Sequence, residues 1–147
     1  MSILEKEPNA TGKHPTELIP TTQIGRTSGP GDGIKQHIRV CTASDGARIA
    51  YAVAGSGPPL VKAANYLTHL EHDWNSLIWQ HWWQGLSETH QLIRYDARGS
   101  GLSDWNVTSY SMDDWVRDLQ AVVDALNLDH IALLGISQGH GFVSPMR

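Results

Sequence analysis

The sequence predicts an α/β fold that begins with a β-hairpin and continues as strand, helix, strand, helix and strand. Two alternating apolar runs, at 38–42 and 49–53, flank a Ser-Asp-Gly turn at 44–46 and indicate the hairpin. Two later segments carry apolar residues at helical spacing, and short apolar runs stand beside them. This order is that of the first part of a three-layer sandwich with right-handed crossovers.

The middle of the chain is expected to hold a strand at 60–64, an amphipathic helix at 73–86 and another strand at 91–95. A Gly- and Pro-rich segment at 55–59 separates them from the hairpin. Large aromatic residues at helical spacing more often pack in a core than form a ligand platform, so we assign the apolar stripe of this helix to the core. The stripe consists of Trp74, Leu77, Ile78, Trp82 and Leu86.

A second helix is expected to begin after Ser111, which is placed to cap it. Asp113 and Asp114 fall in its first turn, where carboxylates favour the positive end of the helix dipole. Asn127 is expected to end the helix, and 131–134 is an apolar run without alternation, typical of a parallel strand covered on both faces. The buried stripe of the helix is predicted to be Trp115, Leu119, Val122, Val123 and Leu126.

The composition divides the chain into a tail and one domain. Residues 1–35 contain four prolines and many Gly, Ser and Thr residues without sustained apolar periodicity, which is typical of a disordered tail or linker. Residues 36–147 are long enough for a single domain with a core.

Charge and targeting signals limit the classes of partner. A formal net charge of −4 with 11 Lys and Arg residues offers no basic surface, so we expect no nucleic-acid and no membrane partner. No apolar signal segment is visible, and the single cysteine, Cys41, cannot form an internal disulfide; both features favour the cytoplasm. No cofactor fingerprint or metal-binding cluster is recognisable, so we expect neither a cofactor nor a metal.

Two motifs indicate chemistry. The sequence GISQG at 135–139 is a G-x-S-x-G motif directly after the expected buried strand, where a serine is placed on a sharp turn with positive φ. The sequence DARGSGLSD at 96–104 follows the strand at 91–95. With these two motifs in this order, the chain resembles the α/β-hydrolase superfamily of serine-nucleophile type over about 38–139.

The resemblance implies the N-terminal half of an α/β-hydrolase three-layer sandwich, from the hairpin to the nucleophile elbow. The chain would be truncated before the sixth strand of the family's sheet, which follows the nucleophile elbow. A finer resemblance, to hydrolase domains fused behind cyclase or transcription-regulator modules, lies in CTASDG at 41–46 and LVKAAN at 60–65. It would make residues 1–35 the remnant of an interdomain linker.

The resemblance also assigns roles to residues. Ser137 matches the nucleophile, and the backbone N–H groups of Gln138 and Tyr66 match the two oxyanion donors. The commoner family pattern has His-Gly where this chain has Ala-Asn at 64–65, which bears on the geometry of the second donor. Asp96 and Arg98 look structural in this family.

Two positively charged residues have no role in this reading. Lys62 and Arg94 stand in strands that should be central and apolar, and the sequence gives no firm account of them.

In this superfamily the catalytic acid and histidine follow the nucleophile in chain order. Only one of the eight histidines, His140, follows Ser137, and it is badly placed to act as a base. We therefore expect an acyl hydrolase by family that acts on a small-molecule ester, thioester, amide or related substrate, with this chain inactive alone.

The end of the chain adds two expectations. The segment after the elbow contains Pro145 inside an expected helix, so we hypothesise a premature stop or a frameshift near Gly139. The strand at 131–134 is expected to be an exposed apolar edge. The alternatives to an acyl hydrolase are a non-catalytic binding or interaction module, completed by a complementing chain, and a defective gene fragment.

Overall fold

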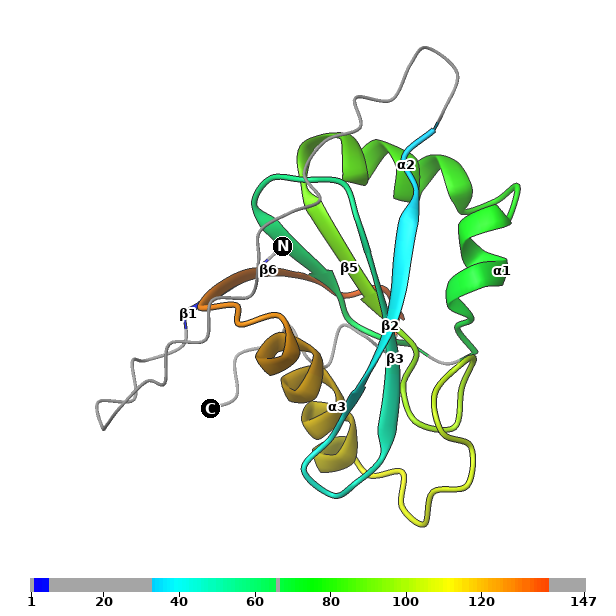
Figure 1. Ribbon diagram of the computed structural model, residues 1–147, viewed down its shortest axis with the longest axis vertical. Coiled ribbons are helices and arrows are strands. Elements are labelled where there is room, and N and C mark those ends of the chain that lie inside the picture. Colours follow the sequence, from blue (N-terminus) through cyan, green and yellow to red (C-terminus); the bar gives the residue numbers. More distant parts are fainter. Residues whose placement is uncertain (1, 6–32, 66, 138–147) are drawn as a thin grey trace.

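The computed structural model describes residues 2–5, 33–65 and 67–137. Within these residues the chain forms one mixed six-stranded sheet with helices on both faces (Figure 1). The strands are β1 (Ser2–Glu5), β2 (Gln36–Thr42), β3 (Arg48–Ala54), β4 (Pro59–Lys62), β5 (Gln91–Tyr95) and β6 (His130–Leu134). The helices are α1 (Leu70–Asn75), α2 (Gln80–Thr89) and α3 (Met112–Ala125).

The strands are arranged in the order β1-β6-β4-β5-β3-β2. β4 lies at the centre of a parallel group, paired with β5 on one side and β6 on the other, while β2 and β3 form the predicted antiparallel hairpin. The hairpin turn places Gly46 at φ 93°, a conformation that glycine adopts without steric cost. The predicted α/β architecture is therefore confirmed.

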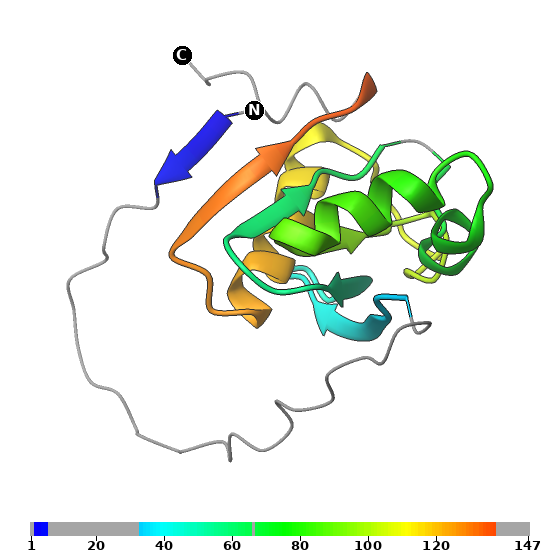
Figure 2. The same cartoon turned by 90° about the horizontal axis from the view of Figure 1, so that it is seen from above.

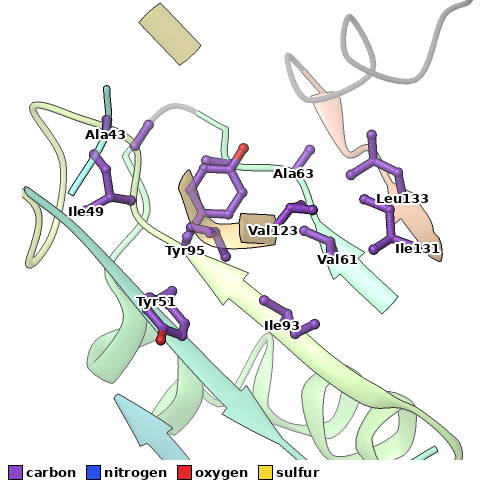
Figure 3. Close-up of a cluster of buried hydrophobic side chains, with 13 residues drawn as sticks. Ala43, Ile49, Tyr51, Val61, Ala63, Ile93, Tyr95, Val123, Ile131 and Leu133 are labelled. Atoms are coloured by element: carbon purple, nitrogen blue, oxygen red, sulfur yellow. The ribbon is translucent and has the colours of Figure 1, made fainter. Parts of the chain in front are cut away.

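Helices α1 and α2 cover one face of the sheet and α3 covers the other (Figure 2). The face under α3 carries the main apolar core, in which Val122 and Val123 of the helix meet Val61, Ile93 and Leu133 of three neighbouring strands (Figure 3). These strand residues are almost completely excluded from solvent. The predicted stripe of α3 is confirmed, since its remaining members also pack against this cluster.

The N-terminus of α3 has the predicted cap. The Ser111 side chain accepts a hydrogen bond from the Asp114 backbone N–H, and the Asp114 carboxylate accepts from the Ser111 backbone N–H. This reciprocal pair satisfies two donors that the first turn of a helix leaves unpaired. At the other end Asn127 adopts φ 51°, which ends the helix as expected.

The helix predicted at 73–86 is wrong in its extent and in part of its buried face, although Trp74 and Leu86 of the predicted stripe pack against an apolar cluster as expected. The chain forms two helices, α1 and α2, separated by residues 76–79. Ser76 caps the end of α1 and its hydroxyl accepts from the Ile78 backbone N–H, which stabilises a turn instead of a continuing helix. As a result Leu77 and Ile78 are 86% and 70% exposed, and the buried tryptophan of α2 is Trp83.

The expectation of an exposed edge at β6 is also wrong. β1 pairs with β6 in antiparallel register, with Ser2 opposite Leu133 and Glu5 opposite His130. An unpaired edge strand presents a row of free backbone N–H and C=O groups, and an additional strand satisfies them. Four residues of the segment assigned to a tail or linker are thus part of the sheet, while 6–32 lie outside the described residues.

Candidate functional site

Ser137 lies just beyond the carboxyl end of β6, where the described part of the chain ends. It adopts φ 55° and its side chain is exposed. A positive φ on a residue other than glycine costs about 1 to 3 kcal/mol and persists only where its surroundings impose it. The preceding residue, Ile136, packs against the apolar cluster under α2, which anchors the turn on one side.

The loop after β4 lies beside this turn. β4 and β6 are parallel neighbours, and the Ala63 backbone N–H donates to the Leu134 carbonyl at 2.9 Å, one step beyond the ladder of the two strands. The segments that follow β4 and β6 therefore leave the same edge of the sheet side by side. Asn65 is half-buried in the segment after β4, and Ser137 belongs to the segment after β6.

The two candidate oxyanion donors, Tyr66 and Gln138, lie outside the described residues. Each is the direct neighbour of a described residue, Asn65 in one case and Ser137 in the other. The site as described thus consists of the serine, the start of the loop after β4 and the groups that support them.

Asp96 holds the loop after β5 in place. Its Oδ2 accepts from the backbone N–H groups of Leu70, at 3.1 Å, and Leu102, at 3.0 Å. The carboxylate also fits closely against Gly101, since a Cβ there would lie 2.0 Å from Oδ2. Ser103 completes the loop by donating to the Asp96 carbonyl at 2.6 Å. These contacts support the structural interpretation of Asp96.

Arg98 ties the same loop to α3 and to the hairpin turn. Its guanidinium donates to Asp118 at 2.7 Å and to Asp45 at 2.6 Å, and Asp114 lies within 3.6 Å. Arg98, Asp114 and Asp118 are all buried. The backbone N–H of Arg98 also donates to Asp118, so one carboxylate fixes both the side chain and the loop backbone. Arg98 is thus a structural link here.

The two cations without an assigned role lie together on the face covered by α1 and α2. Lys62 is 5% exposed and Arg94 is 4% exposed. The Arg94 guanidinium donates to Gln36 at 2.5 Å and to the Leu70 carbonyl at 3.0 Å. It also lies 5.3 and 5.0 Å from the ring centroids of Trp74 and Trp83, within range of cation–π attraction.

Lys62 has a different partner. Its ammonium donates to the Asn65 side-chain oxygen, Oδ1, three residues further along the chain. Burial lowers the pKa of Lys62 to about 8 and that of Arg94 to about 10, because the charged form of each group loses solvation. Asp73 and Asp96 partly oppose the shift at Lys62.

The apolar cavity nearest to these loops lies on the other face, toward α3. Its volume is about 240 Å³. Asn65 borders it, as does the ring of Tyr95 at the end of β5. The remaining lining residues are Ala64, Ala97, Arg98, Gly99, Ser100, Tyr110 and Trp115.

Neither a metal cluster nor a membrane-crossing helix is found in 2–5, 33–65 or 67–137. No group of three or more His, Cys, Asp or Glu side chains in these ranges could hold a metal ion. No helix in them has the length and apolar character needed to cross a bilayer.

Sequence comparison identifies the fold family. Residues 67–144, more than half of the chain, match the profile of the alpha/beta hydrolase fold family. The chain belongs to this family. The match includes the loop after β5, helix α3, strand β6 and the G-x-S-x-G motif.

Individual α/β hydrolases agree with this assignment. A non-heme chloroperoxidase from Streptomyces lividans is 33% identical over 106 residues, which cover 70% of this chain and 36% of that protein. The structure of an α/β hydrolase from Sphaerobacter thermophilus aligns with a TM-score of 0.58 and 30% identity, covering 70% of this chain and 37% of that one. An esterase from a Rhodococcus species aligns with the same TM-score and 31% identity, covering 69% and 37%. The chain thus spans little more than a third of the length of these relatives.

Proposed function

We propose that this chain carries the nucleophile part of a serine-dependent hydrolase for esters, thioesters, amides or related acyl bonds. The observation that carries the proposal is the positive φ of Ser137 just after β6, which runs parallel to β4, inside the G-x-S-x-G motif. This conformation exposes the serine hydroxyl on a sharp turn, as acyl transfer to a serine requires. The similarity to an esterase supports the same class of substrate.

In the proposed reaction the Ser137 Oγ attacks the acyl carbonyl carbon, and its proton passes to a base. The carbonyl oxygen becomes an oxyanion, which the backbone N–H groups of Gln138 and Tyr66 are proposed to stabilise. Loss of one such donor typically costs about 10²- to 10³-fold in rate. The leaving group departs with a proton, and water then hydrolyses the acyl-enzyme and regenerates the serine.

We further propose that these 147 residues alone do not turn over substrate. Hydrolases with this elbow place the acid and the histidine after the serine, and here only His140 follows it. A serine hydroxyl without an oriented base is a weak nucleophile. The base and acid would come from sequence beyond these residues or from a complementing chain.

Two measurements on the purified 147-residue chain test this function. The first is turnover of short acyl esters, and the second is intact-mass detection of covalent labelling by a fluorophosphonate probe over several hours. We expect no turnover, and slow labelling at Ser137. Ser137→Ala should abolish the labelling, whereas Ser56→Ala, at an exposed turn serine, should retain it.

The outcomes separate the alternatives. Multiple turnover that disappears in Ser137→Ala would contradict the inactivity of the isolated chain but support the nucleophile. A stably folded chain in which Ser137 is not labelled faster than other exposed serines would contradict the nucleophile role and favour a binding module.

A further inference from the structure

We propose that Lys62 is a positioning residue, whose buried ammonium fixes the Asn65 side chain and thereby the start of the loop after β4. The inference rests on the proposed function in one respect, because the residue that follows Asn65 in the sequence, Tyr66, is a proposed oxyanion donor. The contact itself is independent of any chemistry at Ser137.

The geometry gives the lysine a specific target. Lys62 is the last residue of β4, and its ammonium donates to the Asn65 Oδ1. On the strand side, the Ala63 backbone N–H is bound to the Leu134 carbonyl at 2.9 Å. The short segment between Lys62 and Asn65 is therefore held from two directions, by a backbone bond to β6 and by the side-chain bond from Lys62.

The cost of burying this charge argues that it does more than fill space. The residue that precedes Lys62 on the same face of β4 is Leu60, and Leu60 lies opposite Leu92 of β5. Both leucines are fully buried and apolar. No carboxylate of the described residues comes within ion-pair distance of the Lys62 ammonium. A buried ammonium without an ionic partner destabilises a fold relative to an apolar residue of similar volume.

The Asn65 side chain is a suitable intermediary. An ammonium is a donor only and a carboxamide oxygen an acceptor only, so the contact fixes which way the amide group of Asn65 points. Asn65 also borders the apolar cavity of about 240 Å³. Fixing Asn65 therefore sets one wall of that cavity as well as the start of the loop beside Ser137.

The charge state of Lys62 should control this contact. Burial lowers its pKa to about 8, and repulsion by Arg94 in β5 also lowers it. Attraction by Asp73 in α1 and by Asp96 after β5 raises the pKa and partly offsets these effects. The neutral amine that forms above this pH has lost the charge that strengthens its hydrogen bond to the carboxamide. The hold on Asn65 should thus weaken as pH rises through about 8.

The test compares Lys62→Met, Asn65→Ala and the double variant in the full chain, with Lys35→Met, at an exposed lysine, as the control. We expect the amide hydrogens of the loop after β4 to exchange roughly tenfold faster or more in each single variant, as for a lost charged hydrogen bond. The double variant should show no further increase, because Lys62 acts through Asn65. Lys35→Met should leave exchange in the loop unchanged.

A second readout is the side-chain amide resonance of Asn65 measured against pH. It should shift with a midpoint near pH 8 in the wild type, and this titration should vanish in Lys62→Met. If Lys62→Met does not fold, the wild-type titration and the exchange of Asn65→Ala still test the contact.

Three results would overturn the inference: unchanged exchange in the loop of a folded Lys62→Met variant, additive effects in the double variant, or an Asn65 resonance that does not respond to Lys62 ionisation. The experiment should give the same answer in a Ser137→Ala background, because the contact between Lys62 and Asn65 does not involve Ser137. Failure of the nucleophile proposal for Ser137 therefore leaves the positioning role of Lys62 intact, and the failure of either proposal can be distinguished from that of the other.

Discussion

The two faces of the central sheet are built on different principles. Under α3, strand residues such as Val61, Ile93 and Leu133 form a continuous apolar layer. Under α1 and α2, β4 and β5 present Leu60 and Leu92 and then, toward their carboxyl ends, Lys62 and Arg94. The face under α3 is apolar along these strands, whereas the other face combines an apolar cluster with charge next to the edge of the sheet where Ser137 lies.

The buried cations of the two sides differ in the same way. Arg98, beyond the strand ends on the α3 side, is surrounded by Asp45, Asp114 and Asp118. Lys62, on the α1 side, has a neutral carboxamide as its hydrogen-bond partner. A cation with full ionic compensation suits a structural link, and one without it remains able to change its charge near neutral pH.

The largest effect is expected from breaking the compensated site. Asp118→Ala removes the carboxylate that binds both the guanidinium and the backbone N–H of Arg98. Breaking a buried pair typically costs about 3 to 5 kcal/mol, because the remaining charge stays buried without its partner. Urea denaturation should show this loss. Asp129→Ala, at an exposed carboxylate, should change stability by less than about 0.5 kcal/mol, and a similar small effect at Asp118 would contradict the structural link.

An effect of nearly the same size is expected within the apolar face. Ile93→Ala removes a side chain that is fully buried between β4, β3 and α3, and such truncations cost about 2 to 5 kcal/mol. Val40→Ala on the edge strand β2, where the valine is half exposed, is the matched control and should cost far less. Equal losses in thermal or urea unfolding would show that this face is not the main source of stability.

The smallest effect is expected at Lys62, where the free energy of unfolding should depend on pH. Its folded pKa of about 8 lies below the unfolded value of 10.5, so between these values the unfolded chain binds more protons. The free energy of unfolding should therefore rise from pH 8 toward pH 10, by at most about 1.4 kcal/mol per pH unit from this group.

Lys62→Met should remove this rise and be at least as stable as the wild type at pH 7, since it replaces a buried charge that has no ion-pair partner among the described residues by an apolar side chain. Parallel urea titrations at pH 7, 8 and 9 measure the difference between the two proteins. A wild type and variant whose stabilities keep a constant difference over this range would contradict a lowered pKa at Lys62.

Local patterns predicted most of the fold. The hairpin, α3 with its capping box at Ser111 and Asp114, and the positive φ of Ser137 all follow from residues close in sequence, because turns, caps and elbows are determined by short-range sterics and hydrogen bonds. These are the features for which a single sequence contains the whole physical cause.

The errors concern features that depend on distant partners. The apolar spacing of 73–86 fits one helix, but the hydroxyl of Ser76 and the docking of Trp83, whose indole N–H donates to the Asp73 carbonyl, favour two. The environment of Arg94 could not be predicted, because it is formed by Trp74 and Trp83, which lie in separate helices. The contact of Lys62 with Asn65 joins residues only three positions apart. That spacing alone does not predict a hydrogen bond, because the contact also depends on how the strand and the loop of this fold are arranged.

The pairing of β1 with β6 has a consequence for how the chain acquires its structure. Ser2 and Leu133 are partners although almost the whole sequence separates them, so closing this contact carries one of the largest loop entropies available to the molecule. We thus expect the pairing of β1 to be the last step in closing the described sheet, and β6 offers unpaired backbone groups to other strands until this step occurs.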